Sequence, residues 1–206
     1  MFLHSYRTMV ACREIDAVVV IVPEGYADDA RKWAESIDEG ASLEIRLGGD
    51  TRLESVRRGL EALPSGAERV VCHDAARPFA SVELFGRVLA RLRGVQGVVP
   101  VVPSPDTVKR VREGLVIETV PRDELGLVQT PQAFAAEALV DAHRRARQKR
   151  LRATDDAVLL EAAGYRVAAV EGDPGNFKIT TPEDLRRAEF LVADLRASPA
   201  TPEGAR

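Results

Sequence analysis

Apolar and polar positions along the chain follow two alternating periods, which predicts a succession of strands and helices. Buried strands are predicted at residues 17–22, 43–47, 69–73 and 97–102. Amphipathic helices are predicted at residues 1–12, 26–37, 52–63 and 81–92. This alternation is typical of an α/β domain with a Rossmann-like, doubly wound and mostly parallel sheet joined by right-handed crossovers.

The pattern changes after Pro103. Residues 107–111 and 115–120 interleave apolar and polar positions around a turn at residues 112–114, which predicts a protruding β-hairpin. A hairpin has few contacts of its own, so we expect this β-arm, residues 103–127, to pack on a partner.

The remaining residues return to the α/β body and predict one domain over residues 1–196. The elements expected there are a strand at 128–134, helices at 136–147 and 155–163, strands at 165–170 and around Lys178, and a helix that starts at 181–184. Thr154 is expected to cap the second of these helices. We assign Trp33 to the core and His143 to a solvated helix face, and residues 197–206 to a flexible tail.

The composition excludes several classes of protein. Of 206 residues, 45% are hydrophobic and 30% charged, which is typical of a globular protein. The net charge of −3 gives no general attraction for a polyanion such as nucleic acid. No apolar run approaches the ~18 residues that span a membrane. Cys12 and Cys72 both lie in apolar surroundings, so we expect free thiols and a cytoplasmic location.

The first candidate site follows the strand at residues 69–73, where Asp74 precedes Ala75, Ala76 and Arg77. Ligands of open α/β sheets bind at the carboxyl ends of strands, and a carboxylate there suits a divalent cation such as Mg²⁺. The two alanines leave room for a ligand beside the backbone. The residues alone equally allow a helix-capping aspartate and a surface arginine. His73 is interpreted as structural.

A second candidate lies at Gly48-Gly49, between a strand and a helix that Asp50 or Thr51 can cap. Glycines allow positive φ and close backbone approach, and N–H groups at a helix start can bind an anion or a base edge. Ser55 lies one turn into the helix.

Several motifs together resemble the 2-C-methyl-D-erythritol 4-phosphate cytidylyltransferase family. They are His73-Asp74-Ala75-Ala76-Arg77-Pro78, residues 48–56, residues 106–109, residues 130–134, Thr154-Asp155-Asp156, and residues 176–180. The resemblance covers nearly the whole chain in order. It implies transfer of CMP from CTP to methylerythritol phosphate with release of pyrophosphate, Mg²⁺ as cofactor, and a homodimer in which the arm completes the neighbour's site.

The resemblance also implies residue roles. Arg122 and Lys178 would orient the attacking phosphate, and Asp74 would hold the metal. The nucleotide contacts would be Gly48, Gly49, Asp50, Ser55, Ala75 and Ala76, and the substrate contacts Asp74, Arg77, Thr107, Arg122, Thr154 and Lys178. The arm residues Thr107 and Arg122 would act across the dimer.

One departure from the family is large: its opening strand and glycine-rich nucleotide loop have no counterpart here. Neighbouring strands should then lack a partner on one side. The family's loop also carries an arginine and a lysine, and the absence of these two side chains should nearly abolish turnover. Three interpretations stay open: a cytidylyltransferase whose recorded start is too late, an inactive binding or dimerisation subunit, and a cytidylyltransferase for another polyol phosphate such as ribitol phosphate.

Overall fold

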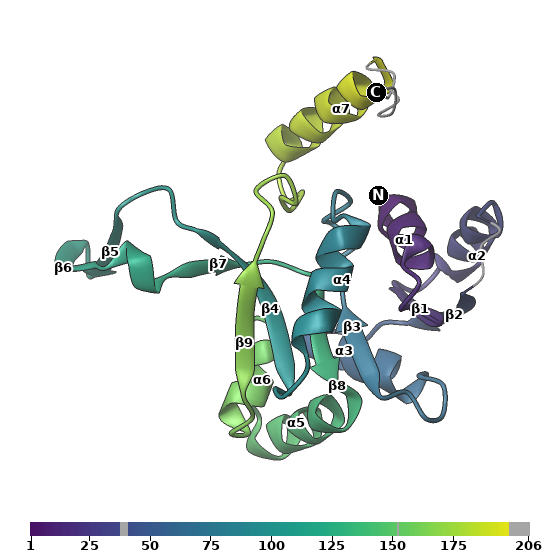
Figure 1. Cartoon of the computed structure of the whole chain (residues 1–206), viewed down its shortest axis with the longest axis horizontal. Helices are drawn as coiled ribbons and strands as arrows, with labels where there is room; N and C mark the ends of the chain where they lie inside the picture. The colour runs from purple at the N-terminus through teal and green to yellow at the C-terminus, as the bar shows by residue number, and fades with distance from the viewer. Residues whose placement is uncertain (38–40, 152, 198–206) are drawn as a thin grey trace, which may run out of the picture.

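The computed structural model describes residues 1–37, 41–151 and 153–197 and is an α/β fold (Figure 1). Its helices are α1 (Phe2–Ala11), α2 (Ala27–Glu35), α3 (Arg52–Glu61), α4 (Val82–Arg91), α5 (Ala136–Lys149), α6 (Ala157–Ala162) and α7 (Pro182–Ala197), with a 3-10 turn η1 (Arg122–Glu124). Its strands are β1 (Ala17–Val22), β2 (Ser42–Leu47), β3 (Arg69–Cys72), β4 (Gly97–Pro103), β5 (Val108–Arg112), β6 (Leu115–Val120), β7 (Gly126–Val128), β8 (Gln132–Ala135) and β9 (Val167–Glu171).

The central sheet holds β3, β8, β4 and β7 in that order, with β9 paired to β4. The β4–β9 pair is parallel, whereas β8 runs antiparallel to both β3 and β4. β3, β4 and β9 therefore point the same way, with one antiparallel strand between β3 and β4. The predicted strand at 128–134 is divided into β7 and β8 around a cis peptide bond between Thr130 and Pro131.

The other body strands, β1 and β2, form a separate parallel pair. Within the described residues, β1 pairs only with β2 and β3 pairs only with β8. A cavity of about 680 Å³ lies between β1 and β3 and is lined by residues of both strands. Within the described residues, the predicted continuous sheet is therefore interrupted between β1 and β3.

Helices cover both faces of the strands, as the apolar strand sequences require. α3, α5 and α6 pack on one face, where Phe134, Leu139 and Leu160 are fully buried. α1 and α4 pack on the opposite face around Phe85 and Val98. The doubly covered α/β architecture agrees with the sequence prediction.

The arm projects from the body as the hairpin β5–β6 (Figure 1). Its turn places Glu113 and Gly114 at φ of 50° and 80°, the left-handed pair that a type I′ hairpin turn requires. Exposed apolar residues lie along it: Val111, Leu115, Val116, Ile117 and Leu127.

Three local expectations need correction. The Trp33 side chain is not core but 47% exposed, because α2 packs inward through the small residues Ala30 and Ala34. The segment around Lys178 is an irregular loop, not a strand. α7 begins at Pro182 as predicted and reaches Ala197, while the remaining predicted tail, 198–206, lies outside the described residues.

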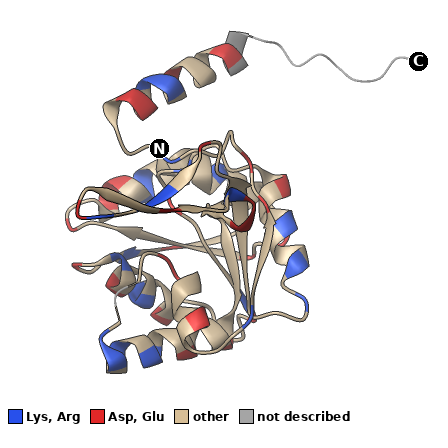
Figure 2. Cartoon of the chain, turned by 90° about the vertical axis from the view of Figure 1, so that its left-hand side faces the viewer, with Lys and Arg blue, Asp and Glu red and all other residues tan. Residues whose placement is uncertain are grey.

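Charge is distributed over the body without a basic face on the side that Figure 2 shows, where acidic and basic segments are interspersed. None of the helices in the described ranges combines the length and the apolar run that crossing a membrane requires.

Candidate functional site

The site is organised around Asp74, directly after β3. One carboxylate oxygen, Oδ2, accepts a hydrogen bond from Lys178 Nζ at 2.8 Å, and Oδ1 lies 3.8 Å from Arg52 Nε. The Asp74 side chain is 22% exposed, so it is sheltered yet reachable by a ligand. Two of the predicted residues, Asp74 and Lys178, are thereby brought together across 104 residues of sequence.

The backbone of Asp74 is held by a short relay. Its N–H donates to Thr130 Oγ1 at 3.0 Å, and that oxygen lies 3.1 Å from His73 Nδ1. His73 Nε2 lies 3.1 Å from the Arg77 carbonyl oxygen. Burial lowers the pKa of His73 to about 4, so the ring is neutral near pH 7. A neutral ring that donates from Nε2 and accepts at Nδ1 fits both contacts, which supports the structural role given to His73.

The Gly48-Gly49 turn connects β2 to α3. Neither glycine has a positive φ, so the expected left-handed backbone is absent there, but the close approach is present: a Cβ on Gly48 would lie 2.9 Å from Ser55 Oγ. Ser55 Oγ accepts from the Gly49 N–H at 3.1 Å. Thr51, not Asp50, caps α3 by accepting from the Glu54 N–H. Ser55 therefore shapes the turn, and exposed Asp50 lies at its tip.

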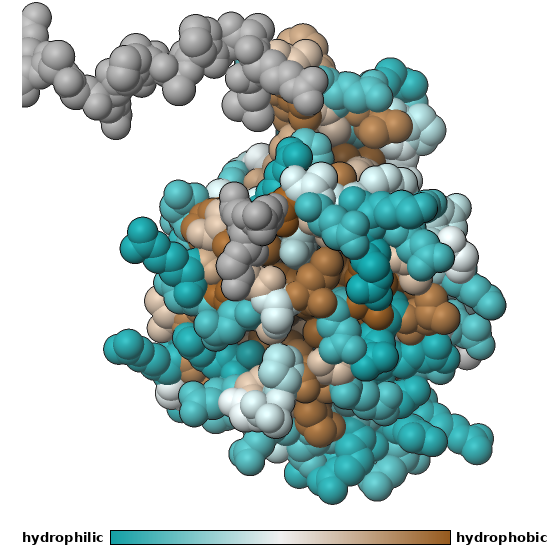
Figure 3. Space-filling model, turned by 90° about the vertical axis from the view of Figure 1, so that its right-hand side faces the viewer, coloured by the Kyte–Doolittle hydropathy of each residue, from teal (hydrophilic) through white to brown (hydrophobic). Residues whose placement is uncertain are grey.

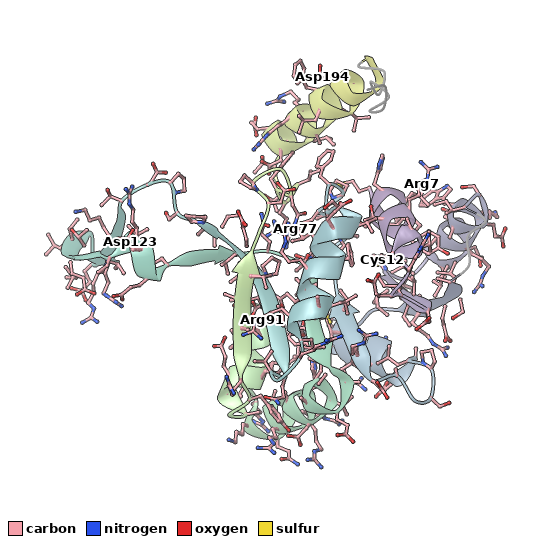
Figure 4. All side chains as sticks on the ribbon, in the orientation of Figure 1. Arg7, Cys12, Arg77, Arg91, Asp123 and Asp194 are labelled. Atoms are coloured by element: carbon pink, nitrogen blue, oxygen red, sulfur yellow. The ribbon has the colours of Figure 1, made fainter. Side chains whose placement is uncertain are left out.

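The loop that carries Lys178 is fastened beside Asp74 by backbone contacts. The Ile179 N–H donates to the Ala76 carbonyl at 2.8 Å, and Arg77 Nη1 donates to the Asn176 carbonyl at 2.8 Å. Asn176 is fully buried and donates to the Thr130 carbonyl. Arg77 thus ties two loops together, while Ala75 is exposed at the mouth of the site. Figure 4 shows Arg77 near the upper ends of β4 and β9.

A buried cluster behind the site escaped sequence reasoning. Asp156, which is completely buried, accepts from Arg52 Nη2 at 2.7 Å and lies 3.0 Å from His143 Nε2. Burial raises the pKa of Asp156, but the hydrogen bond to His143 and the charge of Arg52 outweigh it and lower that pKa overall. Burial alone would lower the pKa of Arg52. The charge of Asp156 and its hydrogen bond outweigh burial, so the pKa of Arg52 is raised overall.

This cluster corrects the placement of His143, which is 6% exposed and not on a solvated face. Its spacing from Leu139, Ala142 and Ala146 along α5 is the helical signal that could have identified it. Asp156 is part of the Thr154-Asp155-Asp156 motif, in which sequence reasoning selected only Thr154.

Thr154 does not cap the helix that follows. α6 begins later, at Ala157, and Asp155 Oδ1 accepts the Val158 N–H at 3.1 Å. The Asp155 carboxylate takes the capping role predicted for the Thr154 hydroxyl, because the chain bends over residues 154–156 before the helix starts. Thr154 itself is exposed.

The arm residues are not brought to Asp74 within the chain. Thr107 and Arg122 are exposed, and Figure 4 shows Asp123, the neighbour of Arg122, far from Arg77. Their predicted roles would therefore require a second copy of the chain.

The donor set around Asp74 restricts the kind of metal site that can form. Within the described ranges, no three His, Cys, Asp or Glu residues group as metal ligands. Asp156 is occupied by Arg52 and His143. Asp74 would therefore supply a single carboxylate, an arrangement that suits a Mg²⁺ ion held jointly with phosphate oxygens better than a site made by protein alone.

Comparison with known proteins assigns the family. A sequence model described as 2-C-methyl-D-erythritol 4-phosphate cytidylyltransferase (IspD) matches residues 1–194. A bifunctional IspD/IspF enzyme of Nitratidesulfovibrio vulgaris is 45% identical over 186 residues, 88% of this chain but 47% of the relative, so the chain spans about half the length of such relatives. A 2-C-methyl-D-erythritol 4-phosphate cytidylyltransferase of Microcystis aeruginosa is 40% identical over 90% of this chain and 84% of its own length.

A solved structure agrees with these sequence matches. The crystal structure of 2-C-methyl-D-erythritol 4-phosphate cytidylyltransferase from Thermus thermophilus superposes with a TM-score of 0.78 at 42% identity, over 92% of this chain and 89% of that one. The chain therefore belongs to the 2-C-methyl-D-erythritol 4-phosphate cytidylyltransferase family.

Proposed function

We propose that the site transfers CMP from CTP to 2-C-methyl-D-erythritol 4-phosphate. A phosphate oxygen of the methylerythritol phosphate attacks the α-phosphorus of CTP, a new P–O bond forms, and the bond to pyrophosphate breaks. The grouping of Asp74, Lys178 and Arg52 at the end of β3 carries this proposal. It supplies one metal-binding carboxylate and two cations where two anions must meet.

The proposed division of work follows from what each group can do. Lys178 and Arg122 orient the attacking phosphate, and Asp74 binds Mg²⁺ together with the phosphates of CTP. When bound, Mg²⁺ neutralises charge on the transferring phosphoryl group. Because a phosphate nucleophile is already deprotonated near neutral pH, no general base is required. The catalytic contribution of the protein is positioning and charge stabilisation.

The remaining contacts are assigned by position. Gly49, Asp50 and Ser55 would contact the cytidine from the β2–α3 turn, where Gly48 permits the close packing. Ala75 and Ala76 would contact the nucleotide at the mouth of the site. Arg77, Thr107 and Thr154 would contact the substrate.

The second part of the proposal is a homodimer formed through the β-arm. Val111 and Val116 are cross-strand partners, 59% and 62% exposed, and Leu115 beside them is 69% exposed. Burial of such a row against a second copy would remove its apolar surface from water. Sedimentation of the wild type and of Val116→Glu tests this: a dimer that becomes a monomer supports the proposal, and a monomeric wild type overturns it.

Two free cysteines, Cys12 and Cys72, support the proposed cytoplasmic location.

The activity itself is tested with enzyme in excess over labelled CTP, so that a single slow turnover is detectable. We expect CMP to appear in a diphosphate-linked methylerythritol product in the presence of Mg²⁺, and Asp74→Ala to abolish it. Asp141→Asn, a carboxylate on α5 engaged with Arg144, is the matched control and should keep the activity. No product from the wild type, or product only with ribitol 5-phosphate, would refute the proposed reaction.

A further inference from the structure

Aromatic and cationic side chains contact the loop that carries Lys178. The Phe177 ring stacks on the Phe79 ring, with centroids 5.3 Å apart and an angle of 27° between the planes. Arg187 of α7 places its Cζ 4.1 Å from the centroid of the Phe177 ring, which is a cation–π contact. Because Phe79 lies in the loop that follows Asp74, three segments of the chain meet at the Phe177 ring. We call Phe79, Phe177 and Arg187 the aromatic clamp.

The residues on either side of Lys178 are held by contacts outside the candidate site. Lys178 Nζ donates to Asp74 Oδ2 at 2.8 Å, whereas Phe177 is in the aromatic clamp. Ile179 lines, together with Leu185 of α7, a cavity of about 360 Å³ between α7, the site loops and the start of α1. Both neighbours of Lys178 therefore face α7, while Lys178 itself reaches the site. A shift of α7 would move the backbone from which Lys178 extends.

The first two turns of α7 attach it to the Lys178 loop. The helix stands above the body and joins it at one end, and Figure 3 shows it as a lobe at the top of the molecule. At that end the Asp184 carboxylate accepts from the Thr180 and Thr181 N–H groups, each at 2.9 Å. Farther along, Val192 lines the cavity and Phe190 is exposed, so the later turns are packed less closely. The aromatic clamp therefore acts where α7 is attached.

Two consecutive arginines of α7 have different contacts. Arg186 forms an ion pair with Glu183 of the same helix, and its side chain is 67% exposed. In the part of the chain that the structure describes, no carboxylate forms an ion pair with Arg187, whose guanidinium lies over the Phe177 ring instead. Arg187 thus links α7 to another segment, whereas Arg186 makes a contact within the helix. The pair offers a matched comparison at adjacent positions.

We infer that Arg187 is a positioning residue: through Phe177 it couples α7 to the Lys178 loop and holds the Lys178 ammonium beside Asp74. A lysine side chain loses rotamer freedom when it binds an anion, and a fixed backbone limits the further freedom that is lost. Holding the ammonium in place therefore favours its contact with the attacking phosphate. As a step in CMP transfer this role rests on the proposed function, whereas the holding of the loop does not.

Hydrogen exchange of the full chain, followed by mass spectrometry, tests the holding of the loop without substrate. The Ile179 N–H, which donates to the Ala76 carbonyl at 2.8 Å, reports on the loop. Arg187→Met keeps helix propensity but removes the cation, so amides of residues 176–180 should exchange about three- to tenfold faster, the scale of one cation–π contact. Arg187→Lys should restore most of the protection, and Arg186→Met should leave it unchanged. No acceleration in Arg187→Met, or equal acceleration in Arg186→Met, would overturn the inference.

Single-turnover rates of CMP transfer test whether Arg187 acts through Lys178. Arg187→Met should lower the rate about three- to tenfold, and Arg187→Lys should recover most of it. The double variant with Lys178→Met should be no slower than Lys178→Met alone, because the residue that Arg187 positions is already gone. Losses that multiply in the double variant would show that Arg187 acts on the reactants itself and would overturn the inference. A wild type that makes no product would refute the proposed reaction, and the exchange data would then decide whether Arg187 holds the loop.

Discussion

Arg52 and Asp156 form an ion pair across 104 residues of sequence, with Nη2 2.7 Å from Oδ2. Asp156 is fully buried at the start of α6, and Arg52 is the first residue of α3. The pair therefore fastens the helix that follows the Gly48-Gly49 turn to the body. Because Arg52 Nε also faces Asp74, the pair sets the distance between the turn and the candidate metal ligand.

Asp156→Asn is expected to destabilise the fold by about 1.5–3 kcal/mol, the range for a hydrogen bond to a charged group. The loss stays at this level because the Arg52 side chain is 37% exposed and can be solvated once released. Chemical denaturation measures it. Glu183→Gln, in a surface ion pair with Arg186 whose side chains are 72% and 67% exposed, should change stability much less. Equal losses for the two variants would contradict the anchoring role.

Arg52 and Asp156 meet although they lie far apart in the sequence. Features that depend on such distant contacts could not be predicted from local sequence patterns, whereas local features could. Strand and helix periods are local, so the order of elements, the hairpin and the position of Asp74 follow from spacing. The insertion of antiparallel β8 between β3 and β4, and the separation of β1 from β3, depend on which strands meet. No local period encodes that choice.

Individual side chains also depend on contacts between distant parts of the chain. The arginines that follow His143 predict a solvated helix face, but the spacing of His143 from Leu139 and Ala146 places it on the apolar stripe of α5. A polar residue on such a stripe indicates a buried partner. The partner, Asp156, comes from a distant part of the chain and could be found only in the folded structure.

Lys178→Met is expected to lower the rate of CMP transfer by about 10²–10³, the loss typical for one charge-stabilising donor. Lys178→Arg should recover part of it, because the charge is kept but the geometry differs. The measurement is the single-turnover rate, with Lys149→Met at the end of α5 as control. An unchanged rate in Lys178→Met would remove Lys178 from the reaction.

Gly172→Ala and Gly86→Ala should change stability in opposite directions. A Cβ on Gly172 would lie 2.7 Å from Gln129 Oε1 and 3.0 Å from the Val101 carbonyl, so it displaces the amide that binds Asp173. The expected loss is about 1–3 kcal/mol. Gly86 lies inside α4, and beyond its chain neighbours and the local helix backbone nothing lies within 4 Å of the added Cβ, so alanine should stabilise by roughly 0.5–1 kcal/mol. Thermal or chemical unfolding measures both, and a shared sign would contradict the packing described for Gly172.

Asp184 should make the stability of α7 depend on pH in the acid range. Its carboxylate accepts from the Thr180 and Thr181 N–H groups, each at 2.9 Å, and these hydrogen bonds, Thr180 first, lower its pKa to about 2 from an ordinary 3.8. A carboxyl group whose pKa is lower in the folded state stabilises fully above pH 3.8, and this stabilisation is lost as pH falls toward 2. The difference in melting temperature between wild type and Asp184→Asn should therefore be constant from about pH 7 to about 5 and shrink below about 4. A difference that persists unchanged to about pH 3 would show that Asp184 acts through packing and not through its charge.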